Sequence, residues 1–207
     1  MSSPLHSPDE RASMTFADLA ERIHALPPRL GPVRLVCVDG PTCSGKTTLA
    51  GRLAAALGGA PTIRMDDLYD GWDGLEAGTE RLRDWVLDPV RAGRPGRYRR
   101  YDWIRGEYAE WHEVPLAPVL VVEGVGSASR VVDRSAALIL WVEAPEEVRY
   151  ARGVTRDQGG FGPYWAAWAR AEAAHFAQQD TRARADVHVD GAPDQTYDAQ
   201  AEFVLSG

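Results

Sequence analysis

Eight consecutive residues carry the clearest chemical signal of the sequence. The segment from Gly40 to Thr47, GPTCSGKT, matches the pattern G-x-x-x-x-G-K-[ST] in full. Its glycines let the backbone form a nest of inward-facing N–H groups, and a following helix adds positive potential at its N-terminus. Lys46 can then reach the β- and γ-phosphates of a nucleotide, and the Thr47 hydroxyl can bind Mg²⁺. The residues assigned to nucleotide binding are Gly40, Thr42, Cys43, Ser44, Gly45, Lys46, Thr47 and, through the α-phosphate, Thr48.

Lysine usage narrows the class of nucleotide-binding protein. Lys46 is the only lysine among 23 basic residues. The guanine-specific motif N-K-x-D of GTPases needs another lysine, so it cannot occur here. Motor ATPases are usually larger and take arginines from neighbouring subunits. The sequence therefore favours a kinase that passes phosphate to a small acceptor.

Two acidic positions follow predicted strands. Asp66 comes after a short strand, and ligands of parallel sheets bind at the carboxyl ends of strands. Its carboxylate can take the proton of an acceptor hydroxyl and help to hold Mg²⁺, with the adjacent Asp67 as the alternative. Glu123 ends the run VLVVE and is typical of a carboxylate that acts on Mg²⁺ directly or through water. We expect Thr47, Asp66 and Glu123 to form the metal site.

Three arginines recur at helical spacing. Arg149, Arg152 and Arg156 share one face of a predicted helix, which leads into the segment QGGFGP at 158–163. Such a stripe is usually a solvated surface, but Arg forks also suit phosphate oxygens. We predict that Arg152 and Arg156 act with Lys46 and Asp66 in catalysis and that 156–164 forms a small lid.

Aromatic and acidic residues predict an acceptor pocket. Tyr69, Asp73, Tyr101 and Trp103 could bind the acceptor, since aromatic rings stack on flat bases and carboxylates bind ribose hydroxyls. The alternative is ordinary packing, because the chain contains seven tryptophans.

These residues need a sheet to position them. Strands are expected at 33–39, 62–65, 117–124, 136–143 and 185–191, and helices at 15–26, 46–57, 79–90, 145–157 and 164–179, with a loop at 66–78 and a helix in the tail from 194. This alternation predicts an α/β, three-layer P-loop NTPase fold with a parallel sheet flanked by helices. The expected organisation is a disordered segment at 1–14 and a single domain at 15–207.

Composition limits the partners. The 207 residues carry a net charge of −7, which argues against a broad basic face for nucleic acid. No apolar run approaches the roughly 18 residues of a membrane span. The two cysteines form neither a disulfide framework nor a metal-ligand pattern. We expect a cytoplasmic protein without nucleic-acid or membrane partners, and the sequence is compatible with a homo-oligomer.

The chain resembles the uridine kinase and phosphoribulokinase group over roughly 33–191. GPTCSGKTT is similar to the phosphate loop of that group, DDLY at 66–69 to its D-S-F-Y element, YDW at 101–103 to its Y-D-F element, and VEGV at 122–125 to its F-E-G-I strand end. The resemblance implies that Asp66 is the catalytic base, that Tyr69 contacts a nucleoside, and that Tyr101 and Trp103 line the base pocket. It also implies that Arg152 and Arg156 belong to a lid helix and that Asp190 and Gly191 lie near adenine.

The acceptor is less defined than the phosphate machinery. The histidine that follows the Y-D-F element in uridine kinases is absent, and IRGE occupies 104–107. The first interpretation is an ATP- and Mg²⁺-dependent kinase that phosphorylates a hydroxyl of a small metabolite, a nucleoside such as uridine or cytidine. One alternative is another acceptor, such as a sugar, a vitamin precursor or an antibiotic. The other is a regulatory nucleotide-binding ATPase.

Overall fold

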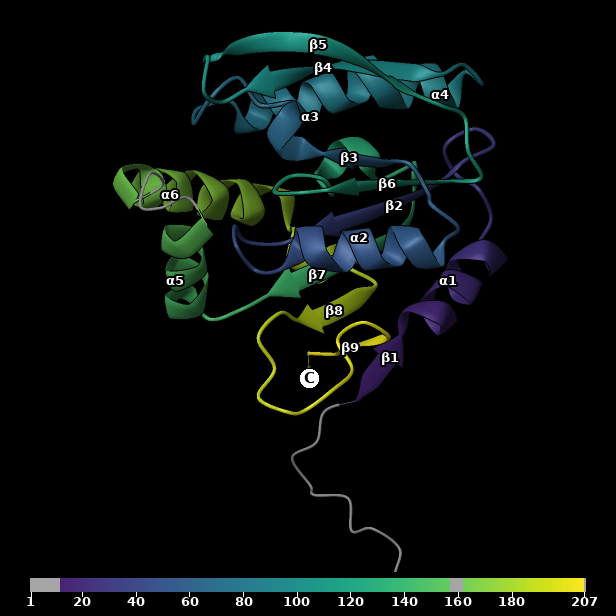
Figure 1. Ribbon diagram of the computed structural model, residues 1–207. Coiled ribbons are helices and arrows are strands. Elements are labelled where there is room, and N and C mark those ends of the chain that lie inside the picture. The colour runs from purple at the N-terminus through teal and green to yellow at the C-terminus, as the bar shows by residue number, and fades with distance from the viewer. Residues whose placement is uncertain (1–11, 157–161, 207) are drawn as a thin grey trace, which may run out of the picture.

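A parallel five-stranded sheet forms the centre of the molecule (Figure 1). The computed structural model describes residues 12–156 and 162–206. The strands run in the order β3-β6-β2-β7-β8, and each neighbouring pair is parallel. Their bounds are β2 Arg34–Asp39, β3 Thr62–Arg64, β6 Val119–Glu123, β7 Ala136–Glu143 and β8 Val187–Asp190. The sheet confirms the predicted α/β class.

Apolar residues cover both faces of the sheet, which accounts for the continuous apolar runs of its strands. In β2, Leu35 and Cys37 belong to one core cluster and Val36 and Val38 to the other, because successive side chains point to opposite faces. The first cluster includes Trp168 of α6 (Gly162–Gln179), and the second is covered by α1 (Phe16–Ala25) and α2 (Lys46–Ala56). The fold therefore has the three layers that the sequence predicted.

Shorter helices complete the layer on the α6 side. The predicted helix at 79–90 is a longer helical segment that changes its winding. It begins as α3 (Leu75–Arg81), continues as a π-helical turn at 82–87 and ends as α4 (Asp88–Arg91). The predicted loop at 66–78 is thus shorter than expected, since it also contains a 3₁₀ turn at 65–67. The chain also forms α5 (Glu146–Arg156) and α7 (Thr181–Arg184), both of which contact α6.

The prediction of a helix in the tail is wrong. Residues Glu202–Val204 form β9, which pairs antiparallel with β1 (Ser13–Thr15). Phe203 is buried there and contacts Phe16 with 5.3 Å between ring centroids, so burial of an apolar side chain favours the strand. Ser13 and Met14, which the sequence placed in a disordered segment, belong to β1. The rest of that prediction, at 1–11, and the centre of the predicted lid, at 157–161, lie outside the described residues.

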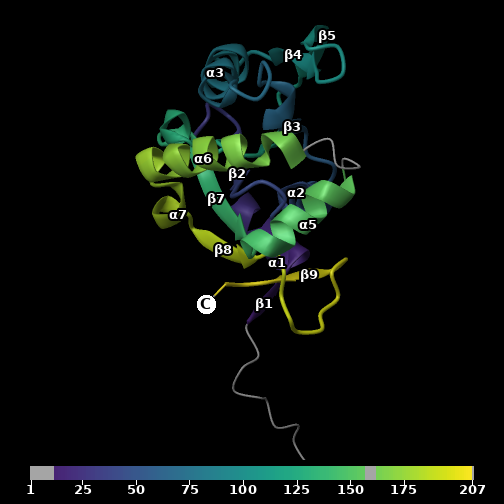
Figure 2. The same ribbon diagram turned by 90° about the vertical axis from the view of Figure 1, so that its left-hand side faces the viewer.

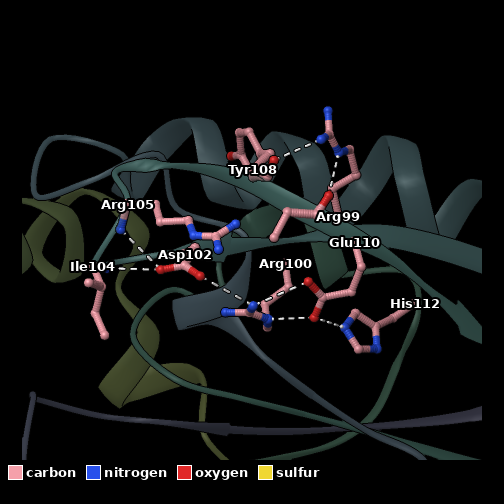
Figure 3. Close-up of polar contacts among 9 residues, drawn as sticks. Arg99, Arg100, Asp102, Ile104, Arg105, Tyr108, Glu110 and His112 are labelled. Carbon is pink, nitrogen blue, oxygen red and sulfur yellow. Dashed lines mark hydrogen bonds and ion pairs between the residues drawn. The ribbon is translucent and has the colours of Figure 1, made fainter.

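A β-hairpin that the sequence did not predict extends from the sheet. Strands β4 (Gly96–Asp102) and β5 (Glu107–Val114) pair antiparallel, and Figure 3 shows the side chains between them. Arg99 donates to the carbonyl oxygens of Tyr108 and Ala109 at 2.7 and 3.0 Å. Arg100 donates to both carboxylate oxygens of Glu110, at 2.7 and 3.2 Å. These cross-strand contacts stabilise a hairpin whose tip reaches the candidate site.

Candidate active site

The phosphate loop lies between the end of β2 and the start of α2. Gly40 has φ 140°, and a Cβ atom there would lie 2.0 Å from the carbonyl oxygen of Val142. Gly45 precedes α2 with φ 110°, in the region that favours glycine. Both glycines of the motif are therefore required by the backbone that the structure shows.

The Lys46 side chain binds two carbonyl groups of its own loop. Its side chain is buried, and Nζ donates hydrogen bonds of 2.8 Å to the carbonyl oxygens of Gly40 and Pro41. The ammonium therefore sits within the arc of the loop, where a phosphate would be its counter-charge.

Two of the three proposed metal ligands, Thr47 and Glu123, are in direct contact. Thr47 Oγ1 donates a 3.0 Å hydrogen bond to Glu123 Oε1. The pKa of Glu123 is raised above its usual value, chiefly because the residue is buried. The Lys46 ammonium opposes this rise, and the Asp66 carboxylate adds to it. Arg64 Nε lies 3.9 Å from the same carboxylate oxygen. Hydroxyl and carboxylate oxygens suit Mg²⁺, which proteins hold through one or two carboxylates together with substrate phosphates.

The pair Asp66 and Asp67 separates clearly in the structure. Asp66 lines the main cavity, and its carbonyl oxygen accepts a 2.9 Å hydrogen bond from Trp103 Nε1. Asp67 turns toward the hairpin, where its carboxylate accepts a 3.3 Å hydrogen bond from the Tyr98 hydroxyl. Burial raises the pKa of Asp67, and the Tyr98 bond opposes that rise. The geometry favours Asp66 over Asp67 as the residue that meets a ligand.

A cavity of about 970 Å³ joins most of the predicted residues. From the predicted set it is lined by Thr42, Cys43, Gly45, Lys46, Thr47, Thr48, Asp66, Tyr69, Trp103, Glu123, Arg152 and Arg156. Gly40, Ser44, Asp73 and Tyr101 are not among its lining residues. Ser44 is fully buried, and Tyr101 instead packs edge-on against Trp103 and Tyr108.

Aromatic rings form one wall of this cavity. Trp72 stacks on Tyr164 with 4.7 Å between centroids and packs against Trp103 at 4.9 Å and Trp168 at 5.9 Å. Tyr69 is buried, and its hydroxyl donates to the carbonyl oxygen of Val125 at 2.6 Å, so only its ring can face a ligand. Trp103 and Tyr164 are the exposed members of the wall, at 38% and 45%.

The arginines of α5 surround the loop at different positions. Arg152 donates to the carbonyl oxygens of Cys43, Ser44 and Gly191, at 3.3, 3.4 and 2.9 Å. Arg156 lines the main cavity. Arg149, which the sequence did not select, donates to the carbonyl oxygen of Thr42 at 3.3 Å.

A second cavity, of about 350 Å³, continues from the first. The two share Gly45, Thr48 and Arg152 as lining residues. Beyond these, the second cavity is lined by residues that include Arg52, Asp190, Gly191, Tyr197 and Phe203. Its lining includes Leu49 and Arg52 of α2, but neither Asp66 nor the residues of the aromatic wall.

Asp39 is a site residue that the sequence analysis missed. One carboxylate oxygen accepts from the N–H groups of Gly40 and Gly126, at 2.7 and 3.1 Å, and the other accepts from Ala128 at 2.8 Å. Asp39 thereby ties the phosphate loop to the segment after β6. Burial raises its pKa, and the bonds from Ala128 and Gly40 oppose this. The sequence did contain a signal for this residue, namely an acidic side chain at the end of an apolar strand.

Two further findings concern the described residues as a whole. Within 12–156 and 162–206, no helix has the length and apolar character needed to cross a membrane. In the same two ranges, no group of three or more His, Cys, Asp and Glu side chains could hold a metal ion.

The fold and the phosphate loop define a protein with the P-loop NTPase fold. A solved structure provisionally described as a uridine kinase from Bacillus stearothermophilus matches with a TM-score of 0.61 at 21% identity, covering 84% of this chain and 96% of that one. A structure provisionally described as a fructose transport system kinase from Silicibacter sp. TM1040 matches with a TM-score of 0.52 at 22% identity, covering 83% and 95%. At these identities, the two structures support the shared fold.

A curated relative shares sequence with part of the chain. A tRNA dimethylallyltransferase from Cereibacter sphaeroides is 31% identical over 162 residues, which are 76% of this chain. The matched part is 50% of that relative, so the chain spans about half its length. No protein-family model matches the sequence.

Proposed function

We propose that the protein is a kinase that transfers the γ-phosphate of ATP to a hydroxyl group of a small molecule. One observation carries the proposal: the phosphate loop, Asp66 and an aromatic wall line the same 970 Å³ cavity. A phosphoryl donor and an acceptor could therefore meet within one cavity. A site that only binds or hydrolyses a nucleotide would not need the aromatic wall beside Asp66.

The donor fits the loop and the second cavity. Phosphates would bind the loop amides and Lys46, as in other proteins with this motif. The 350 Å³ cavity is lined by Thr48 and Arg152, and Asp66 is not among its lining residues. An adenine base would occupy it, with Gly191 at its edge.

The proposed chemistry follows from the charged side chains that line the 970 Å³ cavity. Asp66 would accept the proton of the acceptor hydroxyl as its oxygen attacks the γ-phosphorus and the bond to the β-phosphate oxygen breaks. Lys46, Arg152 and Arg156 would stabilise the negative charge on the transferred group. Mg²⁺ held by Thr47 and Glu123, with Asp66, would neutralise the phosphates.

The aromatic wall favours an acceptor with a flat or apolar part. Trp103 and Tyr164 together expose large ring surfaces beside Asp66, and burying them against a ligand is favourable. A nucleoside such as uridine or cytidine combines a flat base with ribose hydroxyls and is the first acceptor to test. A sugar, a vitamin precursor and an antibiotic follow it.

Acceptor-dependent release of ADP tests the proposal. Mg·ATP is incubated with a panel of nucleosides, sugars and small alcohols, with Lys46→Ala as the blank. Release that rises with one acceptor supports the kinase, and that acceptor names the substrate. Equal release with every compound would instead indicate a regulatory ATPase.

The curated relative suggests one further arm of the same experiment. Because that protein is a tRNA dimethylallyltransferase, tRNA with a dimethylallyl donor is included and the modified nucleoside is measured. The net charge of −7 argues against a broad tRNA-binding surface, so no product is expected. Formation of the modified tRNA, with no ADP release from any hydroxyl acceptor, would replace the kinase proposal.

A further inference from the structure

Three side chains hold Thr42 from outside the phosphate loop. Glu172 Oε2 accepts a hydrogen bond from the Thr42 N–H at 2.9 Å, and Trp168 Nε1 donates to Thr42 Oγ1 at 2.6 Å. Arg149 Nη1 donates to the Thr42 carbonyl oxygen at 3.3 Å. The N–H, the carbonyl and the hydroxyl of Thr42 are thus all engaged by α5 and α6, which Figure 2 shows in front of the sheet.

Glu172 is the centre of this arrangement. The residue is 4% exposed, and a buried carboxylate is costly unless it is paired and hydrogen-bonded. Its second oxygen, Oε1, lies 3.3 Å from Arg149 Nη1. The Thr42 N–H and Arg149 together offset the cost of burying this carboxylate. Glu172 lies within the helix predicted at 164–179, where no motif singled it out.

The residue after Thr42 shows why a fixed Thr42 matters. Cys43 has φ 63°, an unfavourable region for a residue with a side chain. Such a conformation persists only where the surroundings impose it. Glu172 holds the N–H of Thr42, the residue before Cys43, and Arg152 donates to the carbonyl oxygen of Cys43 at 3.3 Å. The turn at Thr42 and Cys43 is therefore held at both ends.

We infer that Glu172 is a positioning residue for the nucleotide phosphates. It acts through the Thr42 N–H: by accepting this bond it keeps the turn at Thr42 and Cys43 in the shape in which the loop receives phosphate. It touches no phosphate itself. The inference rests on the proposed binding of ATP and deepens it. It assigns the shape of the loop to a carboxylate on a helix that is distant in the sequence.

Two conservative substitutions of Glu172 separate the effect of side-chain length from the effect of charge. Glu172→Gln keeps an oxygen that can accept from Thr42 N–H but removes the charge. Glu172→Asp keeps the charge but is one methylene too short to hold the same bond. Glu76→Ala is the matched control, because Glu76 also contacts α6, through a 2.6 Å bond to His175 Nδ1, and does not touch Thr42.

Calorimetric titration with Mg·ADP gives the readout, and the thermal midpoint without nucleotide shows that each variant is folded. Glu172→Asp should bind about tenfold more weakly than wild type, as expected for the loss of a hydrogen bond to a charged group. Glu172→Gln and Glu76→Ala should bind within about threefold of wild type, a change of less than one such bond. A merely structural role would not produce this order.

Other results would overturn the inference. Wild-type affinity in Glu172→Asp would show that the Thr42 bond does not shape the loop. If Glu172→Gln bound Mg·ADP as weakly as Glu172→Asp, the effect would come from the charge of Glu172 and not from its bond to Thr42. In both cases the wild type binds Mg·ADP, so the proposed function stands. A wild type that binds no Mg·ADP would remove the proposed function and this inference together.

Discussion

Thr47 Oγ1 donates a 3.0 Å hydrogen bond to Glu123 Oε1, which joins the phosphate loop to the end of the neighbouring strand β6. Strands β2 and β6 are paired in register, with Val38 opposite Glu123, so the contact follows from the sheet itself. The hydroxyl and the carboxylate are thereby aligned before any ligand binds. A metal held by both would gain from this alignment, because little side-chain freedom remains to be lost.

Glu123→Gln should therefore weaken the response to magnesium more than the binding of the nucleotide. The amide can still accept the Thr47 bond, but it provides no negative charge for the cation. We expect half-maximal activation to need about tenfold more Mg²⁺, an effect comparable to one lost charged contact. Titration of acceptor-dependent activity with MgCl₂ measures this shift, and an unchanged titration curve would argue against Glu123 as a metal ligand.

The two adjacent aspartates should differ sharply when each is replaced by asparagine. Asp66→Asn removes the group that can take the acceptor proton, so phosphate transfer should fall by about 10² or more while Mg·ATP binding is nearly kept. Asp67→Asn changes a group that contacts Tyr98 and should leave most of the transfer intact. Single-turnover transfer and nucleotide titration are measured on both variants. Larger loss of transfer in Asp67→Asn would exchange the two assignments.

The hairpin should influence catalysis through Trp103. Trp103→Phe keeps an aromatic ring at the wall of the cavity but loses the 2.9 Å bond to the Asp66 carbonyl oxygen. We expect kcat/KM for the acceptor to fall by up to about tenfold, the size of one neutral hydrogen bond, with unchanged affinity for Mg·ATP.

Trp111→Phe is the control for that experiment, because Trp111 lies on the same hairpin, is 50% exposed and packs against Trp85. Equal losses in the two variants would assign the effect of Trp103 to stability of the hairpin.

The contacts of Glu110 predict how the hairpin responds to acid. Hydrogen bonds from Arg100, with a further one from His112, lower the pKa of Glu110 from 4.5 to about 2 (Figure 3). A lowered pKa means that this carboxylate stabilises the folded state above pH 4.5 and that the contribution is lost as the pH falls toward 2. Because the side chain is half exposed, salt should screen the effect.

Comparison with Glu110→Gln checks this directly. The difference in Tm between wild type and variant should be small and positive at pH 6, and should disappear by about pH 2. A difference that grows on acidification would have the wrong sign. Measurement in high salt should reduce the difference at pH 6.

The sequence predicted the sheet and the phosphate loop because their signals are local. Residues 35–38 are apolar on both faces, and the loop motif follows directly after Asp39. The hairpin has no such signal: its strands alternate arginine, tyrosine and glutamate, and contacts such as Arg100 with Glu110 become favourable only after the strands pair. The end of the chain is similar, since β9 depends on its pairing with β1.

Part of the candidate site could likewise be predicted from local sequence, and part of it could not. Lys46, Thr47, Asp66 and Glu123 follow strands or begin a helix, so the order of elements brings them to one edge of the sheet. Trp168 belongs to the body of α6, where an aromatic residue is typical of core packing. Its place in the wall of the cavity depends on how α6 crosses the sheet, which no short stretch of sequence specifies.

Lys46 gives the protein one chemically distinct side chain. No other residue of the sequence carries a primary amine in its side chain, and this amine is buried against the carbonyl oxygens of Gly40 and Pro41. An amine-directed acylating reagent therefore has one side-chain amine to modify, and the mass of the peptide that contains Lys46 shows how often it is reached, apart from reaction at the α-amino group. The flanking residues Arg34 and Arg52 remain tryptic cleavage sites, so the labelled peptide can be isolated. The reactivity of this one amine thus reports how far a ligand or another segment covers the loop, without any substitution being introduced.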